Sequence, residues 1–124
     1  MKYDITHALQ SLKPAAQWAL RGDAYSNLEW LDESQTKPTE EEVTAKITAL
    51  NNAEPMRLLR EERDRLIGQS DWRIVKAKET STNIPAGWKT YRQSLRDLPA
   101  SSTPKLDSDN NLDMSSVTWP TPPS

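Results

Sequence analysis

The sequence predicts a small α+β protein: an N-terminal helix and β-hairpin, two consecutive helices, a short strand, a C-terminal helix and an extended proline-rich arm. Apolar residues recur at helical spacing in three stretches, and two short runs of alternating residues flank a glycine-containing link. Five of the nine prolines lie in the last 26 residues, where the helical period vanishes. At 124 residues the chain suits one small domain with appendages, and we divide it into modules 1–37, 38–98 and 99–124.

A short amphipathic helix is predicted over residues 4–12. Its apolar residues follow the spacing i, i+3, i+4 and i+7, and they are Ile5, Ala8, Leu9 and Leu12. Asp4 is placed to cap the start of this helix, because its side chain can accept a hydrogen bond from a free backbone N–H. Pro14 is expected to end the helix.

A β-hairpin is predicted next. Trp18 and Leu20 alternate with other residues, and Leu28 and Trp30 do so again further along the chain. Gly22 lies between the two runs and supplies the backbone freedom that a turn needs. The link is longer than two residues, so the pairing register stays open at this point.

Two consecutive helices are predicted in the middle of the chain. The first begins with a capping-box pattern at Thr39 and Glu42. Its apolar face consists of Val43, Ile47 and Leu50. Pro55 should interrupt the pattern, because proline lacks a backbone donor and clashes with the preceding turn. A second helix is therefore expected over residues 54–67, with Gly68 as its C-cap.

One more strand, one more helix and an arm complete the prediction. The strand is short and consists of residues around Trp72, Ile74 and Val75, and a loop follows over 76–83. A helix is predicted from Pro85 to Leu98, stopped by Pro99. Its apolar face carries Trp88, Tyr91 and Leu95. From residue 99 onward an extended arm is expected, because this segment has too few apolar residues to fold alone.

Composition excludes several classes of site. With no cysteine and a single histidine, the chain lacks disulfides, thiolate chemistry and any multi-histidine metal centre. No apolar run approaches the roughly 18 residues that span a bilayer, and the N-terminus lacks the apolar core of a signal peptide. We therefore expect a soluble protein without a membrane partner. A net charge of −2 gives no basic footprint for nucleic acid.

Few residues suggest catalysis. His7 could act as a base oriented by Asp4, but no nucleophile or phosphate loop accompanies it, and a structural histidine is the simpler interpretation. The acidic run at residues 40–42 could bind a cation, although acidic side chains at a helix start already explain it. The three glycines form neither a phosphate loop nor a dinucleotide fingerprint. We therefore predict no enzymatic activity, no cofactor and no metal site.

The arginines within residues 57–65 allow a second interpretation, in which they contact phosphates. Trp72, Trp88 and Tyr91 would then stack on bases, as in a nucleic-acid-binding accessory protein. Acidic residues interleaved with the arginines would repel the same phosphates, which favours a solvated, salt-bridged face. The three aromatic residues are expected either in the core or in a groove that grips a partner.

The core is predicted to be thin. Leu, Ile, Val and Phe together account for 21 of 124 residues, below the roughly 20% that separates folded from disordered composition. We therefore expect help from a partner or from self-association. Trp119 lies in a proline-stiffened terminus, where a large aromatic side chain would face water unless the arm docks. The arm is expected either to fold back onto its own domain or to insert into another chain.

Four segments in a fixed order carry a family resemblance. They are LLREERD at 58–64, SDW at 70–72, WKTYRQSLRDLP at 88–99 and VTWPTPP at 117–123. Together they resemble the phage tail assembly chaperone family over residues 56–123. The N-terminal stretch GDAYSNLEWLDESQTKPTEEEVTAKI resembles a second module at the front of some such phage proteins.

The resemblance implies a non-enzymatic protein that binds a phage tail-fibre protein and promotes its folding, trimerisation or attachment, in the host cytoplasm or in the virion tail. A permanent hinge or connector subunit of the fibre or baseplate is the alternative. We expect partner binding through the arm and a helical platform: Val117, Trp119, Pro120, Trp88, Tyr91 and Leu95. We expect self-association, as a trimer by analogy with fibre symmetry, through Val43, Ile47 and Leu50.

Overall fold

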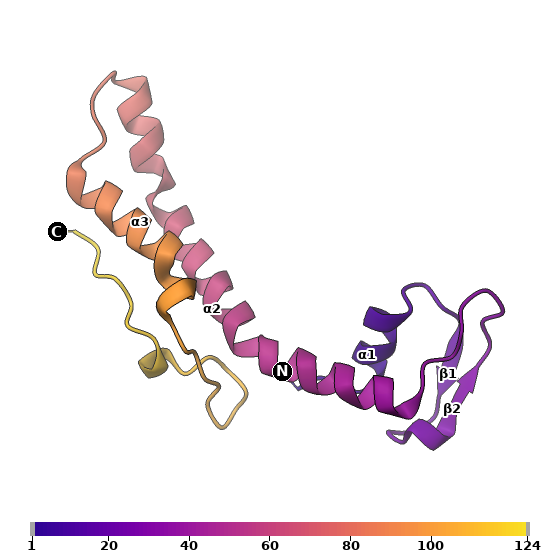
Figure 1. Ribbon diagram of the computed structural model, residues 1–124. Helices are drawn as coiled ribbons and strands as arrows, with labels where there is room; N and C mark the ends of the chain where they lie inside the picture. Colours follow the sequence, from indigo (N-terminus) through magenta and orange to yellow (C-terminus); the bar gives the residue numbers. More distant parts are fainter. Residues whose placement is uncertain (1, 124) are drawn as a thin grey trace. The chain divides into compact units, whose positions relative to one another are not determined.

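A computed structural model describes residues 2–123 of the chain (Figure 1). Its elements, in order, are α1 (Ile5–Leu12), β1 (Trp18–Leu20), a 3-10 turn (Tyr25–Asn27), β2 (Leu28–Trp30), α2 (Glu40–Glu79), α3 (Ala86–Ser101) and a second 3-10 turn (Met114–Ser116). In this described range, three α-helices and a two-stranded antiparallel sheet confirm the α+β class. Two compact units divide the chain, one ending at Glu54 and one beginning at Pro55, and α2 contributes to both. The three-module division stays a prediction.

α1 starts as the sequence predicts, with Asp4 as its N-cap. The Asp4 side chain accepts a hydrogen bond from the backbone N–H of His7 at 3.2 Å, and the Nδ1 atom of His7 accepts one from the backbone N–H of Asp4 at 3.3 Å. This reciprocal pair is a capping box. The backbone bond from His7 is the main reason that the pKa of Asp4 lies below its ordinary value. His7 therefore helps to start a helix.

β1 and β2 form the predicted hairpin. The register places Trp18 opposite Trp30 and Leu20 opposite Leu28. Gly22 in the link has a φ of +88°, a left-handed angle that glycine adopts without the steric cost that a Cβ would bring. Residues of one period-2 face therefore meet across the two strands, as the alternation in the sequence indicates.

A polar network closes the open end of the hairpin. The Asp32 carboxylate accepts hydrogen bonds from the backbone N–H groups of Gln17 at 2.9 Å and of Ser34 and Gln35 at 2.8 Å each. The bond from Gln17 contributes most to a pKa of about 2 for Asp32. The Trp30 indole N–H donates to the carbonyl of Gln35 at 2.9 Å. This end of the hairpin is therefore held by ionic and backbone hydrogen bonds.

The N-terminal core lies between α1, the hairpin and the first part of α2. Its buried apolar side chains are Ala8, Leu9, Leu28 and Val43, and Ile47 is among the half-buried residues packed against them. Tyr3 fastens the chain start to α2, because its backbone N–H donates to the side chain of Asn51 at 2.9 Å and its hydroxyl bonds to the buried carboxylate of Glu54.

α2 runs unbroken over 40 residues, so the two predicted helices are one and the predicted interruption at Pro55 is wrong. Its start is the predicted capping box, in which the backbone N–H of Glu42 donates to the Thr39 hydroxyl at 3.1 Å. Pro55 lacks the donor that would reach the carbonyl of Asn51, and its ring crowds that carbonyl. The contacts of Tyr3 hold the turn just before the proline, and this tertiary support outweighs the local cost.

The predicted C-cap at Gly68 and the predicted strand at 72–75 are also wrong, because both lie inside α2. Gly68 is exposed, and a Cβ at this position would meet no heavy atom within 4 Å. The glycine therefore lowers the stability of the helix only through its poor helix propensity, by about 1 kcal/mol relative to alanine. Strong helix formers on both sides of it, mostly Arg, Glu, Leu and Lys, carry the helix through to residue 79.

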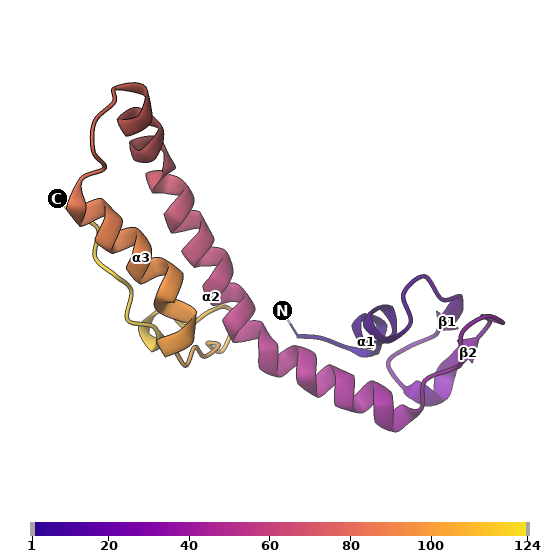
Figure 2. The same ribbon diagram turned by 45° about the horizontal axis from the view of Figure 1, so that its top comes forward.

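Residues 55–79 of α2, α3 and the chain that follows build the C-terminal unit. Figures 1 and 2 show α3 beside this part of α2, with the last segment of the chain returning along α3. α3 passes through Pro99, which was expected to stop it, and ends at Ser101. The core fixes this last turn, because Leu98 is buried against Leu59, and the Ser102 hydroxyl donates to the carbonyl of Leu98 at 2.7 Å.

Arg92 clamps α3 to α2. Its Nη1 atom lies 3.0 Å from the carbonyl oxygen of Ile67, 2.5 Å from the hydroxyl of Ser70 and 2.9 Å from a carboxylate oxygen of Asp71. Ser70 is buried, and its hydroxyl donates to the carbonyl of Ile67 at 2.9 Å while it accepts from Arg92 of the facing helix. One guanidinium thus contacts three groups within about one turn of α2.

The continuity of α2 at Gly68 can be tested with a matched pair of glycine substitutions. We expect Gly68→Ala to raise the free energy of unfolding by about 0.5–1 kcal/mol, because alanine is the better helix former and no atom is crowded. Gly87→Ala, in the first turn of α3, should gain less, because its Cβ would lie 3.2 Å from Pro123. Chemical denaturation measures both, and destabilisation by Gly68→Ala would contradict a continuous helix.

The Arg92 clamp gives a second prediction. Arg92→Ala should lower the free energy of unfolding by about 2–3 kcal/mol, since the buried Ser70 hydroxyl and the Ile67 carbonyl lose a charged donor. Asp71→Asn is the control, because Asp71 is exposed and an exposed ion pair contributes under about 1 kcal/mol. Equal losses in the two variants, measured by chemical denaturation, would show that the ion pair and not the buried contact holds the helices together.

Candidate protein-binding groove

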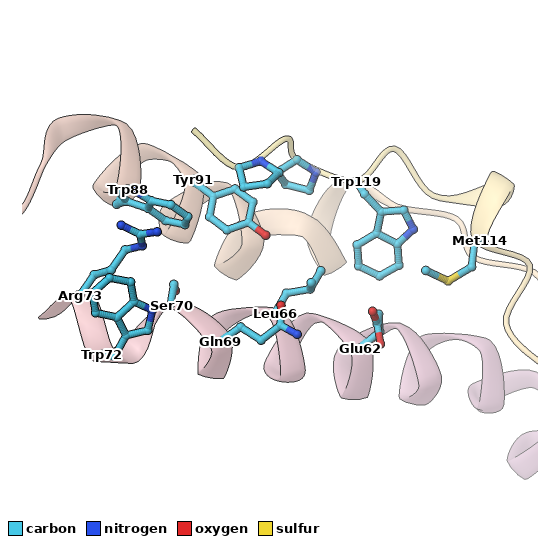
Figure 3. Close-up of a pocket in the computed structure, with 12 residues that line it drawn as sticks. Glu62, Leu66, Gln69, Ser70, Trp72, Arg73, Trp88, Tyr91, Met114 and Trp119 are labelled. Atoms are coloured by element: carbon cyan, nitrogen blue, oxygen red, sulfur yellow. The ribbon is translucent and has the colours of Figure 1, made fainter. Parts of the chain in front are cut away.

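A groove of about 440 Å³ lies in the C-terminal unit between α2, α3 and the end of the chain (Figure 3). Its walls are mainly aromatic, proline and other apolar side chains. The lining residues are Glu62, Leu66, Gln69, Ser70, Trp72, Arg73, Trp88, Tyr91, Met114, Trp119, Pro120 and Pro122. α2 provides the floor, α3 one side, and the returning segment the other.

One end of the groove is a stacked row of side chains from both helices. The guanidinium of Arg73 lies 3.9 Å from the ring centre of Trp88 and 4.4 Å from that of Trp72, so it is held between two indoles. Trp88 in turn meets Tyr91 edge to face, with ring centres 5.5 Å apart. Trp72 is 53% exposed, whereas Tyr91 is buried. The row therefore runs from solvent into the core.

The returning segment, residues 117–123, forms the opposite wall, and we call it the arm tip. Val117 is 6% exposed and belongs to the core cluster with Leu59 and Leu98, against which Trp119 also packs. At the far end Pro123 lies against Gly87, where a Cβ would come within 3.2 Å. The arm tip therefore follows α3 back from its end to its first turn.

Apolar contact alone docks the arm tip. Among residues 2–123, no hydrogen bond joins the arm tip to α2 or α3, and the buried indole nitrogen of Trp119 has no acceptor. The preceding stretch has hydrogen bonds within itself, such as those of Asp107 and Asn111 around the bridge between Leu106 and Leu112. Of the two arrangements left open by the sequence, the structure has the arm folded back on its own chain.

Charges along the groove are paired within the described residues, with one exception. Glu62 accepts hydrogen bonds from Arg65, which hold the pKa of Glu62 below its ordinary value. Further along α2, Arg57 pairs with Glu61 at 3.0 Å, which supports the expected salt-bridged face. Arg73 is the exception, because its guanidinium contacts the two indoles but no hydrogen-bond acceptor in the range 2–123.

The predicted partner-binding residues fall into two groups. Trp88, Tyr91, Trp119 and Pro120 line the groove together. Leu95 and Val117 lie in the core beneath it, with exposures of 0% and 6%. Their binding role stays a prediction. Arg73 was not identified as a site residue from the sequence, because its contact with Trp88 comes from the facing helix. Its position next to Trp72 was the one available signal.

The residues predicted for self-association lie in the N-terminal unit. Val43 is 1% exposed and Ile47 packs against the same core cluster, so both side chains already have apolar neighbours within their own chain. Leu50 is half-buried. Self-association through this set stays a prediction.

Residues 2–123 contain neither a cluster of metal-ligating side chains nor a membrane-spanning helix. No group of three or more His, Cys, Asp or Glu side chains there is arranged to hold a metal ion. Nor does any helix within residues 2–123 combine the length and the apolar character needed to cross a bilayer.

Comparison with known proteins gives one match. A family model described as phage tail assembly chaperone protein matches residues 56–124, more than half of the chain. The match begins one residue after the start of the C-terminal unit and covers the whole groove. No curated protein and no solved structure matches the chain.

The docked arm tip predicts that Trp119 contributes to the stability of its own fold. We expect Trp119→Ala to lower the free energy of unfolding by about 2–4 kcal/mol, because the indole covers the cluster of Leu59 and Leu98. Met114→Ala is the control, since Met114 lines the groove but is 49% exposed and should change stability much less. A melting temperature unchanged by Trp119→Ala would mean that the arm tip is undocked in solution.

Proposed function

Because the chain belongs to the phage tail assembly chaperone family, we propose that it serves phage tail assembly as a non-enzymatic protein that binds the tail-fibre protein and promotes its folding, trimerisation or attachment. The family match carries this proposal, because it falls on the unit that contains the aromatic groove. The N-terminal unit, which ends at Glu54 and includes the first part of α2, lies wholly outside the matched range.

The surface of the C-terminal unit supports a binding role. Trp72, Val75 and Met114 are large apolar side chains that are each about half exposed. Exposed apolar side chains of this size are typical of protein-protein contact sites, where tryptophan often contributes much of the binding energy. Trp72 and Met114 both line the groove, so the exposed apolar surface and the hollow coincide.

A fibre subunit before assembly has the properties that such a surface would serve. Fibre shafts are expected to consist of long repetitive strands, whose unpaired edges and apolar faces aggregate until three chains come together. A small protein that covers an apolar segment at this stage keeps the subunit competent to assemble. Binding alone is sufficient for this activity, since no bond is made or broken.

The charge distribution disfavours the nucleic-acid alternative. The arginines of α2 in the range 57–65 are interleaved with acidic residues, and Arg57, Arg63 and Arg65 each form an ion pair with one of them. Phosphates would have to compete with carboxylates already in place. Flat binding curves with DNA at low salt are the expected result.

Co-expression with the tail-fibre protein of the same phage tests the proposal. We expect the two proteins to co-purify in a fixed ratio and the fibre to become more soluble. Trp72→Ala should lower the yield of complex at least tenfold, because an exposed tryptophan often contributes much of the binding energy. The variant should stay folded, since this exposed indole contributes little to the fold. Leu31→Ala is the matched control, since Leu31 is equally exposed but lies in the N-terminal unit.

Two outcomes bear on the proposal in different ways. A fibre that is soluble and trimeric without this protein, and that forms no complex with it, would contradict fibre binding. Mass spectrometry of purified virions then separates a transient helper from a connector. A fixed copy number in mature particles would assign a permanent structural role, and absence would assign a role during assembly only.

A further inference from the structure

We propose that the groove binds an extended partner segment in which an acidic residue is flanked by apolar residues, and that Arg73 holds the carboxylate. The proposal rests on the proposed function only for the identity of the partner, the tail-fibre protein. The site itself consists of two indoles around one guanidinium.

The stacking of Arg73 leaves one way to engage its charge. Both faces of the guanidinium plane are covered, by Trp72 at 4.4 Å and Trp88 at 3.9 Å. A guanidinium carries its N–H donors in the plane, so they are directed outward along the rim of the stack. A carboxylate matches this fork with two parallel hydrogen bonds, and the indoles hold the fork in place before binding.

The other guanidinium that joins α2 and α3 makes the contrast clear. Arg92 lies within hydrogen-bonding distance of three oxygen atoms, on Ile67, Ser70 and Asp71. Arg73 has none among residues 2–123, although it is half-buried and lines the groove. A structural arginine is satisfied by its own fold, whereas Arg73 has its donors available for an acceptor from outside.

The surrounding charges favour an acidic ligand. Glu62 is the acidic residue that lines the groove, and Arg65 already neutralises it. The carboxylate of Asp71 is engaged by Arg92. Lys76 adds a second positive charge, with its Nζ atom 6.0 Å from the ring centre of Trp72. An approaching carboxylate therefore meets net positive charge at this end of the groove.

The remainder of the groove sets the neighbours of that acidic residue. Beyond the stack the walls are Leu66, Met114, Pro120 and Pro122, and Met114 is 49% exposed. Apolar side chains next to the acidic residue would cover this surface. An extended conformation suits the shape, because the arm tip that forms one wall is itself extended and proline-rich.

A nucleic acid is the less favoured ligand for the same stack. The space between the two indoles is occupied by the guanidinium, so a base cannot insert there. Acidic residues also alternate with the arginines along the adjoining surface of α2.

Substitutions at Arg73 test the site with the co-expressed tail-fibre protein. We expect Arg73→Gln to weaken fibre binding at least tenfold and Arg73→Lys to weaken it about three- to tenfold, because lysine keeps the charge but loses the fork. Lys89→Gln is the matched control, since Lys89 is an exposed cation of α3 that does not line the groove, and it should change binding less than twofold. Melting temperatures verify that each variant is folded.

A synthetic peptide tests the chemistry without the fibre. The probe is the acetylated and amidated peptide Pro-Leu-Glu-Leu-Pro, compared with its Gln counterpart, and the readout is the NMR shift of the Arg73 Nε–H and of the indole N–H groups. The Glu peptide should bind the wild-type protein at least tenfold more tightly than the Gln peptide, and Arg73→Gln should abolish the difference.

The outcomes separate the inference from the proposed function. If the fibre binds wild-type and Arg73→Gln proteins equally and the peptides are not distinguished, the inference fails while fibre binding stands. If the fibre does not bind at all, the proposed function fails, and discrimination between the peptides still supports the site. Tighter binding of single-stranded DNA than of the Glu peptide, lost in Arg73→Gln, would assign the stack to nucleic acid and overturn the inference.

Discussion

The C-terminal unit depends on one apolar contact, that of Val117 with Leu59 of α2 and Leu98 of α3. Two helices side by side cannot enclose a core, because each leaves part of its apolar surface uncovered by the other. The returning segment supplies the third wall. With only 21 Leu, Ile, Val and Phe residues in the whole chain, this end of the protein uses an irregular segment where a larger domain would use another helix.

Local chemistry made much of the fold predictable. The caps at Asp4 and Thr39 and the hairpin follow from side chains that act within a few residues of each other. Three errors concern helix breakers, since Pro55, Gly68 and Pro99 lie inside helices, and a fourth is the strand predicted around Trp72, which is part of α2. Each breaker costs a limited free energy. At Pro55 and Pro99 contacts with distant residues, absent from any local pattern, offset this cost, whereas at Gly68 the neighbouring helix formers do.

The groove was predictable in part. Three large aromatic residues stand out in a chain that is otherwise poor in apolar side chains: Trp88, Tyr91 and Trp119. Trp119 does so most clearly, because it lies among prolines. The assignment of Trp72 to a strand hid its neighbour Arg73, whose contact with Trp88 crosses from α2 to α3. Periodicity along one helix cannot reveal a partner on the next helix, so this residue required the structure.

No hydrogen bond within residues 2–123 joins the arm tip to the helices, whereas Arg73 in the same groove presents a charge. Of residues 120–123 only Thr121 retains a backbone N–H, so shape is what positions this segment. The apolar contacts of the arm tip and the charge of Arg73 therefore respond differently to ionic strength. Added salt screens the charge of the guanidinium, whereas it leaves the apolar ring contacts intact or strengthens them. High salt therefore favours the apolar contacts, and low salt favours the contact through the guanidinium.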